Sequence, residues 1–241
     1  MSKYVVQAGW KDAPHLTADA CNELMEAIPA HQREARMNGT PSLGDGKIYH
    51  VPEEDFRIRP IRIPPHWKQA YGFDVGLRKT AAVFGALDED ADILYIHSLH
   101  YAAEQFPAIH AEAIKSRGAW LQGVIDPAAQ GRNAIDGQRL IEVYEGLGLH
   151  LNPADNAVSA GIYAITQRLV SGRLKVFETL SEWFAEYRLY RRKDGKIVKE
   201  KDHAMDATRY LEMSGLDVAT TMPAPALEEW QWRPGSNKFS G

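Results

Sequence analysis

Three apolar segments follow one another between residues 70 and 101, and only short polar turns separate them. We expect strands over residues 70–76, 80–87 and 93–101. Connections this short join neighbouring antiparallel strands, because a parallel crossover needs many more residues. The chain is therefore expected to build a sheet whose first three strands form an antiparallel meander.

Downstream of this meander the pattern changes to an alternation of helices and strands. Helices are predicted over residues 104–117, 136–145, 158–170, 181–187 and 202–213, and strands over 121–126, 147–151 and 174–177. Such alternation is typical of parallel strands. The expected fold is an α/β domain with a mixed sheet, antiparallel at its start and parallel afterwards, flanked by helices.

The two ends of the chain have a different composition. Residues 1–68 are expected to form an N-terminal accessory segment, with a helix that begins at Thr17 and a proline-rich linker or edge strand over residues 52–68. Proline and glycine also gather in the last residues, where we expect a flexible tail. The predicted division is 1–68, 69–216 and 217–241.

Three aspartates stand where the chain pattern makes a carboxylate informative. Asp74 lies inside the first strand, between Phe73 and Val75, where burying a charge is costly unless something compensates it. Asp126 closes a second apolar strand, and Asp206 lies in the last helix. The carboxyl end of a strand, where Asp126 lies, is where α/β proteins place their sites. We interpret Asp74, Asp126 and Asp206 as catalytic carboxylates.

Two further candidates lie next to Asp206 in the last helix. Asp202 is four residues before Asp206, on the same helix face, and His203 is three residues before it. A cluster of carboxylates would suit Mg²⁺ or Mn²⁺, and a pair of such ions activates water for phosphodiester hydrolysis. Simpler roles stay open, with Asp202 as a helix cap, His203 as a structural hydrogen bonder and Asp126 as a turn former before Pro127.

A basic segment stands out in a chain whose formal net charge is −4. Residues 188–201 carry seven basic side chains against two acidic ones, and the Asp194-Gly195 step predicts a hairpin there. Such a segment suits contacts with DNA phosphates, although a solvated hairpin would have the same composition. The predicted DNA-binding residues are Arg78, Lys79, Arg188, Arg191, Arg192, Lys193 and Lys196.

The composition also bounds the protein class. Cys21 is the single cysteine, so the chain has no internal disulfide and no cysteine pair for zinc. No apolar run is long enough to cross a membrane, no secretion signal is visible, and we expect no membrane partner. Gly44-Asp45-Gly46-Lys47 lacks the spacing and the following Ser or Thr of a nucleotide phosphate loop.

Three motifs resemble, in order, the nuclease domain of tailed-bacteriophage terminase large subunits. They are Gly72-Phe73-Asp74-Val75-Gly76, Ile125-Asp126-Pro127-Ala128 and the segment over residues 202–210. The resemblance covers about residues 68–215 and implies an RNase H-like, or retroviral-integrase-like, fold. It also implies an endonuclease that cleaves double-stranded DNA during viral genome packaging. Two Mg²⁺ or Mn²⁺ ions would be held by Asp74, Asp126 and Asp206, with His203 beside them.

The resemblance extends to the N-terminal segment, because residues 9–16 are similar to the end of the terminase ATPase region. With no phosphate loop, the chain is expected to be a C-terminal fragment without ATPase activity. Its implied partners are DNA, the ATPase domain of the same subunit, the portal and the small terminase subunit. We expect a monomer in isolation, acting in the cytoplasm of the infected host.

Other interpretations remain open from the sequence. A junction resolvase or transposase of the RNase H-like class would use the same chemistry on another substrate. A DNA-docking module without catalysis would tolerate loss of the acids. An actin-like ATPase is disfavoured, because a second phosphate loop and a glycine-rich adenosine site are missing from the sequence.

Overall fold

The computed structural model describes residues 10, 13, 16–27, 37, 46–76, 79–131, 139–193 and 196–224. Seven strands form the central sheet: β1 (Arg57–Ile58), β2 (Lys68–Val75), β3 (Thr80–Asp88), β4 (Ile93–Ala102), β5 (Gln122–Ile125), β6 (His150–Pro153) and β7 (Leu174–Phe177). Two further short strands, β8 (Arg192–Lys193) and β9 (Lys196–Ile197), pair as an antiparallel hairpin.

The sheet has the order β1-β7-β4-β3-β2-β5-β6. Strands β2, β3 and β4 are antiparallel neighbours. Strands β5 and β6 extend the sheet in parallel from β2, and β7 and β1 extend it in parallel from β4. The prediction of a mixed sheet, antiparallel at its start and parallel afterwards, is confirmed.

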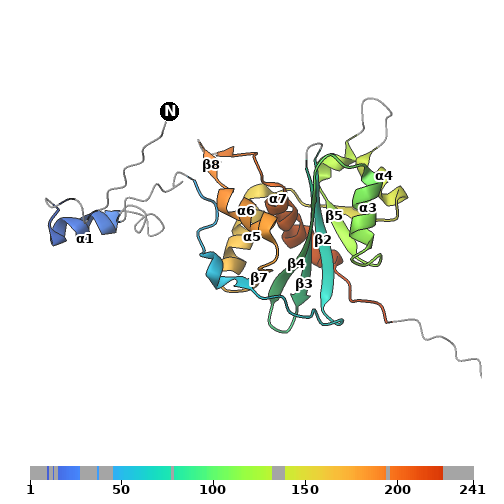
Figure 1. Ribbon diagram of the computed structural model, residues 1–241, viewed down its shortest axis with the longest axis horizontal. Coiled ribbons are helices and arrows are strands. Elements are labelled where there is room, and N and C mark those ends of the chain that lie inside the picture. The colour runs from blue at the N-terminus through green and yellow to red at the C-terminus, as the bar shows by residue number, and fades with distance from the viewer. Residues whose placement is uncertain are drawn as a thin grey trace, which may run out of the picture.

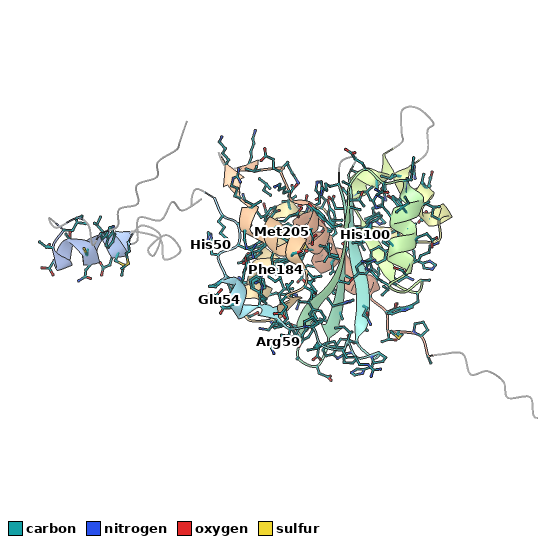
Figure 2. The ribbon with its side chains drawn as sticks, viewed as in Figure 1. His50, Glu54, Arg59, His100, Phe184 and Met205 are labelled. Atoms are coloured by element: carbon teal, nitrogen blue, oxygen red, sulfur yellow. The ribbon has the colours of Figure 1, made fainter. Side chains whose placement is uncertain are left out.

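Helices cover both faces of this sheet (Figure 1). On one face lie α5 (Val158–Val170), α6 (Ser181–Leu189) and α7 (His203–Tyr210), and on the other lie α3 (Pro107–Lys115) and α4 (Leu140–Gly146). Each face has its own apolar core, with Trp183 and Met205 in the first and Phe84 and Tyr144 in the second. Figure 2 shows Met205 and His100 on opposite sides of the sheet.

The alternation of side chains along β2 decides which of its residues face α7. Tyr71 and Phe73 belong to the core beneath α3 and α4, so Gly72 and Asp74 point to the opposite face. A Cβ atom at Gly72 would collide with the carbonyl oxygen of Ala207, because the backbone of α7 lies directly on this strand. The glycine thus permits the close approach of α7 that brings its side chains to Asp74.

Several predicted boundaries were wrong. The helix predicted from residue 104 begins at Pro107, because proline favours the first helical turn. The strand predicted over residues 147–151 lies at His150–Pro153, after a turn through Gly148 with φ of 87°. The helix predicted over residues 202–213 is α-helical only over His203–Tyr210, and Leu211–Gly215 continue it as the π-helix η4.

The segments on either side of the predicted core domain pack against the sheet. Tyr49 and Phe56 are fully buried in the core beneath α6, and β1 adds an edge strand. Beyond the 3₁₀ turn η5 (Leu216–Val218), Thr220 forms a bridge with Gln69 of β2. The packed unit therefore extends past residues 69 and 216, and the division at those positions stays a prediction. Residues 225–241 lie outside the described part.

Near the N-terminus, α1 (Ala18–Ala27) begins after Thr17, whose Oγ1 accepts a hydrogen bond from the backbone N–H of Ala20 at 3.2 Å. This is the predicted capping role of Thr17. The helix lies apart from the sheet in Figure 1. No helix in the described part of the chain is long and apolar enough to span a membrane.

Candidate active site

Asp74 and Asp126 come from two neighbouring parallel strands. Strand β2 pairs with β5 through Phe73 and Ile125, and the backbone N–H of Asp126 donates to the carbonyl oxygen of Phe73 at 3.1 Å. The two aspartates therefore leave the sheet side by side at its carboxyl edge. The predicted turn-forming role of Asp126 also holds, since its side chain accepts a bond from Ala128 N at 2.9 Å.

Helix α7 brings His203 and Asp206 to this edge. The Nδ1 atom of His203 donates a hydrogen bond to Oδ2 of Asp74 at 2.7 Å. Asp74 and Asp206 are both buried, with 8% and 6% of their surfaces exposed. Asp74 and His203 are 129 positions apart in the sequence. The hydrogen bond between them therefore depends on how closely α7 packs on Gly72.

The negative charges of Asp206 and Asp126 act on Asp74. Burial raises the pKa of Asp74, the hydrogen bond from His203 opposes that shift, and the negative charges of Asp206 and Asp126 add to it. The pKa of Tyr210 is raised by burial and then by the charges of Asp126, Asp206 and Asp74. All three carboxylates predicted from the sequence therefore share one electrostatic environment around Tyr210.

Two cationic side chains lie against Asp206. Lys199 Nζ is 2.7 Å from Oδ2 of Asp206 and 3.2 Å from Oδ2 of Asp202. On the other side, Arg209 Nη2 is 3.2 Å from Oδ1 of Asp206. Asp202 precedes α7 but makes no side-chain capping bond. Asp202 therefore contributes a second buried carboxylate, and its side chain does not have the helix-capping role that the sequence left open.

The donor set suits a hard divalent cation, because it consists of carboxylate oxygens. Oδ1 of Asp206 and Oδ2 of Asp202 are buried and, apart from their ion pairs with Arg209 and Lys199, have no hydrogen-bond partner. Across the described residues, no three His, Cys, Asp or Glu side chains are grouped so as to hold a metal ion. The acids are compensated in this structure by His203, Lys199 and Arg209.

Glu186 of α6 is a site-supporting residue that the sequence did not reveal. Its carboxylate is 2% exposed and accepts hydrogen bonds from Tyr101 Oη and from the backbone N–H of Ala204, both at 2.6 Å. Burial raises the pKa of Glu186, and these hydrogen bonds oppose the shift. Glu186 thus caps the N-terminus of α7 from another helix and fixes where His203 begins that helix.

Three residues that contact α7 or its aspartates, Arg209, Lys199 and Glu186, were not predicted as part of the site, and only one of them had a signal in the sequence. Arg209 follows Asp206 by three positions on the same helix, so helical spacing alone indicated the pair. Lys199 and Glu186 reach α7 from a preceding connection and from another helix, and no local pattern indicates such contacts. Lys199 was interpreted from the sequence only as part of the basic segment.

The predicted DNA-binding residues lie in different surroundings. Lys193 and Lys196 are exposed on the hairpin, and Arg191 and Arg192 are partly buried there. Arg188 is tied to Glu53 by two hydrogen bonds, of 2.5 and 2.7 Å. Arg78 lies outside the described residues.

Lys79 lies over the ring of Tyr101, with its Nζ 4.5 Å from the ring centroid. It lines a pocket of about 540 Å³ together with Glu186, Lys199 and His203. The pocket gives solvent access to His203 and to the ammonium of Lys199.

Comparison with known proteins identifies the fold as RNase H-like. Residues 72–214 match the model of the terminase RNaseH-like domain. The P22 large terminase nuclease domain superimposes with a TM-score of 0.69 at 29% identity, covering 75% of this chain and 97% of that domain. The chain belongs to the terminase RNase H-like domain family, and the resemblance found in the sequence is confirmed.

Two further similarities bear on the extent of the chain and on its fold. The terminase large subunit of Enterobacteria phage LP7 is 32% identical over 223 residues, which is 87% of this chain and 46% of that subunit. The chain thus spans less than half the length of this curated relative. The g2p large terminase nuclease domain of bacteriophage SPP1, solved with bound Mn, shares the fold with a TM-score of 0.50 at 15% identity, covering 66% of this chain and 96% of that domain.

Proposed function

We propose that this chain is a metal-dependent endonuclease that hydrolyses phosphodiester bonds of double-stranded DNA during viral genome packaging. One observation carries the proposal: in a chain of the terminase RNase H-like family, Asp74, Asp126 and Asp206 meet at the carboxyl edge of two parallel strands. A buried carboxylate whose pKa is raised by burial and by neighbouring carboxylates, as at Asp74, is typical of sites that bind cations or move protons.

The proposed cofactor is a pair of Mg²⁺ or Mn²⁺ ions held by Asp74, Asp126 and Asp206, with Asp202 and His203 as further candidates. Such ions would activate the attacking water and stabilise the leaving 3′ oxygen. The Mn in the SPP1 nuclease domain, which shares this fold, supports the choice of ion.

The chain's own residues orient the site. Asp74 is held by the sheet and by the hydrogen bond from His203, and Arg209 fixes Asp206 from the side away from Lys199. Glu186 fixes the start of α7, so Asp206 keeps its position relative to Asp74.

The proposed substrate surface is the hairpin with the adjoining lysines. Lys193 and Lys196 lie exposed at its end, and Arg191 and Arg192 follow from α6. Lys47 extends this basic surface, because it bridges to Arg191 and lies 5.5 Å from the ring centroid of Tyr187. Clustered basic side chains bind phosphates without reading bases, so weak sequence preference is expected.

The proposed context is a packaging motor in the cytoplasm of the infected host. The curated relative is about twice as long, which supports an ATPase domain in the same subunit. We propose the portal and the small terminase subunit as further partners. The chain itself is proposed to be monomeric in isolation and to lack ATPase activity.

The test is cleavage of supercoiled plasmid DNA with Mg²⁺ or Mn²⁺. The parent chain should nick and linearise the plasmid, and Asp74→Asn and Asp206→Asn should abolish this. Asp90→Asn, which alters an exposed carboxylate in the β3–β4 turn at the other end of the sheet, should not. Equal cleavage by the site variants and the parent would refute the proposal. Preferential cutting of a four-way junction would reassign the substrate.

A further inference from the structure

Lys199 holds two carboxylates of the site at once. Its ammonium is 2.7 Å from Asp206 of α7 and 3.2 Å from Asp202, which precedes that helix and is four positions before Asp206. Two negative charges at this spacing repel each other on a helix, so the lysine charge offsets that repulsion. Asp202 and Asp206 are only 5% and 6% exposed, whereas the side chain of Lys199 is 61% exposed. The ammonium therefore approaches buried acids from the solvent side.

Arg209, the other cation in contact with Asp206, is held much more firmly than Lys199. It is 1% exposed, and its Nη1 atom donates to Oδ1 of Asn156 at 2.9 Å. Its side chain lies against Gly161 of α5, where any Cβ atom would meet it. Arg209 is thus a fixed part of the core. Lys199, on a flexible stem with a strongly hydrated ammonium, can return to water at little cost.

We propose that Lys199 is a replaceable counter-ion whose ammonium neutralises Asp206 and Asp202 until a divalent cation binds and displaces it. The inference rests on the proposed function in one respect, because that function makes Asp206 a metal ligand. It adds that Lys199 sets the affinity of the site for the cation.

Competition follows from the position of the ammonium. A cation bound by Oδ2 of Asp206 needs the oxygen that Lys199 contacts at 2.7 Å, and the two positive charges would repel. The lysine of this pair is largely exposed to water, which screens its attraction to the acids, so displacing it should reduce cation affinity by no more than about fivefold.

The test is a thermal titration of the full 241-residue chain with Mn²⁺ alone, without DNA. Without Mn²⁺, Lys199→Gln should melt below the parent, because two buried carboxylates lose their counter-ion. At saturating Mn²⁺ the two should melt together, and the half-saturating concentration should be roughly two- to fivefold lower for Lys199→Gln. Lys201→Gln removes the same charge from an exposed neighbour and should change that concentration far less.

A second measurement uses the unaltered chain. Acetylation of each lysine by an amine-reactive ester is followed by mass spectrometry with and without Mg²⁺. Release of the ammonium should make Lys199 react faster in Mg²⁺, while Lys201 should be unaffected. An unchanged or slower rate at Lys199 would overturn the proposal.

The outcomes separate this inference from the proposed function. If Mn²⁺ stabilises the parent but not Asp206→Asn, and Lys199→Gln has the parent's half-saturating concentration, the role of Lys199 alone is refuted. A melting deficit of Lys199→Gln that persists at saturating Mn²⁺ would show an ordinary structural ion pair and refute it as well. If Mn²⁺ does not stabilise even the parent, the metal site itself is refuted, and the counter-ion role with it.

Discussion

Replacing Gly72 with alanine tests whether the approach of α7 to β2 assembles the site. A Cβ atom at this position would lie 2.8 Å from the backbone nitrogen of Leu211 and 3.0 Å from the carbonyl carbon of Ala207, and it would collide with the Ala207 oxygen. Ordinary contact begins at 3.4 Å, so the backbones must separate by at least about 0.6 Å at Leu211 and by more at Ala207. No side-chain rotation relieves contacts with backbone atoms.

The expected cost follows from overpacking. Inserting a methyl group into a closely packed interface destabilises proteins by about 1–3 kcal/mol, and a backbone contact belongs at the upper end of that range. For a chain of this size the corresponding fall in melting temperature is about 2–12 °C. Moving α7 also moves Asp206 away from Asp74, and a shift of about 1 Å in such a site costs up to about 100-fold in rate.

The assay has two parts. Urea unfolding is monitored by tryptophan fluorescence, to which the buried Trp183 contributes, and nuclease activity is measured as plasmid cleavage in Mn²⁺. Gly146→Ala is the matched control, because a Cβ atom there meets nothing within 4 Å at the end of α4. It should be neutral or stabilise the chain by up to about 1 kcal/mol. If Gly72→Ala unfolds and cleaves like the parent, the close packing of α7 on β2 does not position the site.

Three further predictions concern other parts of the molecule. Burial and then the charge of Arg117 lower the pKa of His97 from 6.5 to about 4. Between pH 6.5 and pH 4, His97 is therefore protonated in the unfolded chain but neutral in the folded chain. Stability should therefore fall as pH drops from 6.5 to 4, and His97→Gln should flatten that slope in urea unfolding; parallel slopes would refute it. Tyr101→Phe removes the hydroxyl donor to Glu186 and should cost about 1.5–3 kcal/mol by the same method; an unchanged midpoint would show that this bond does not secure α7. Replacing Lys193 and Lys196 with alanine should reduce the salt dependence of DNA binding by about one to two units of log–log slope, and an unaltered slope would move the DNA path elsewhere.

The strands of the sheet were predictable because their signals are local. The apolar runs of β2, β3 and β4 and the short turns between them determine an antiparallel meander almost by themselves. Helix ends were less predictable, since Pro107 and the π-helical turn at Leu211–Gly215 depend on the chain's packing against the sheet. Phe56 was assigned to a linker segment because its partners in α6 lie more than 120 residues away.

The aspartates of the site were predictable for a different reason. A carboxylate inside an apolar strand, as at Asp74, is unusual enough to indicate function without a structure. The counter-charges were not predictable, because Lys199 and Glu186 reach α7 through tertiary packing. The sequence therefore indicated which acids meet but not how they are neutralised.

The most direct test of the central claim is anomalous diffraction from crystals of this chain soaked in Mn²⁺. The account predicts two Mn²⁺ peaks at the carboxyl edge of β2 and β5, with oxygens of Asp74, Asp126 and Asp206 as ligands and with Lys199 withdrawn from Asp206. Mn²⁺ peaks elsewhere on the chain, with these three carboxylates unliganded at saturating Mn²⁺, would contradict it.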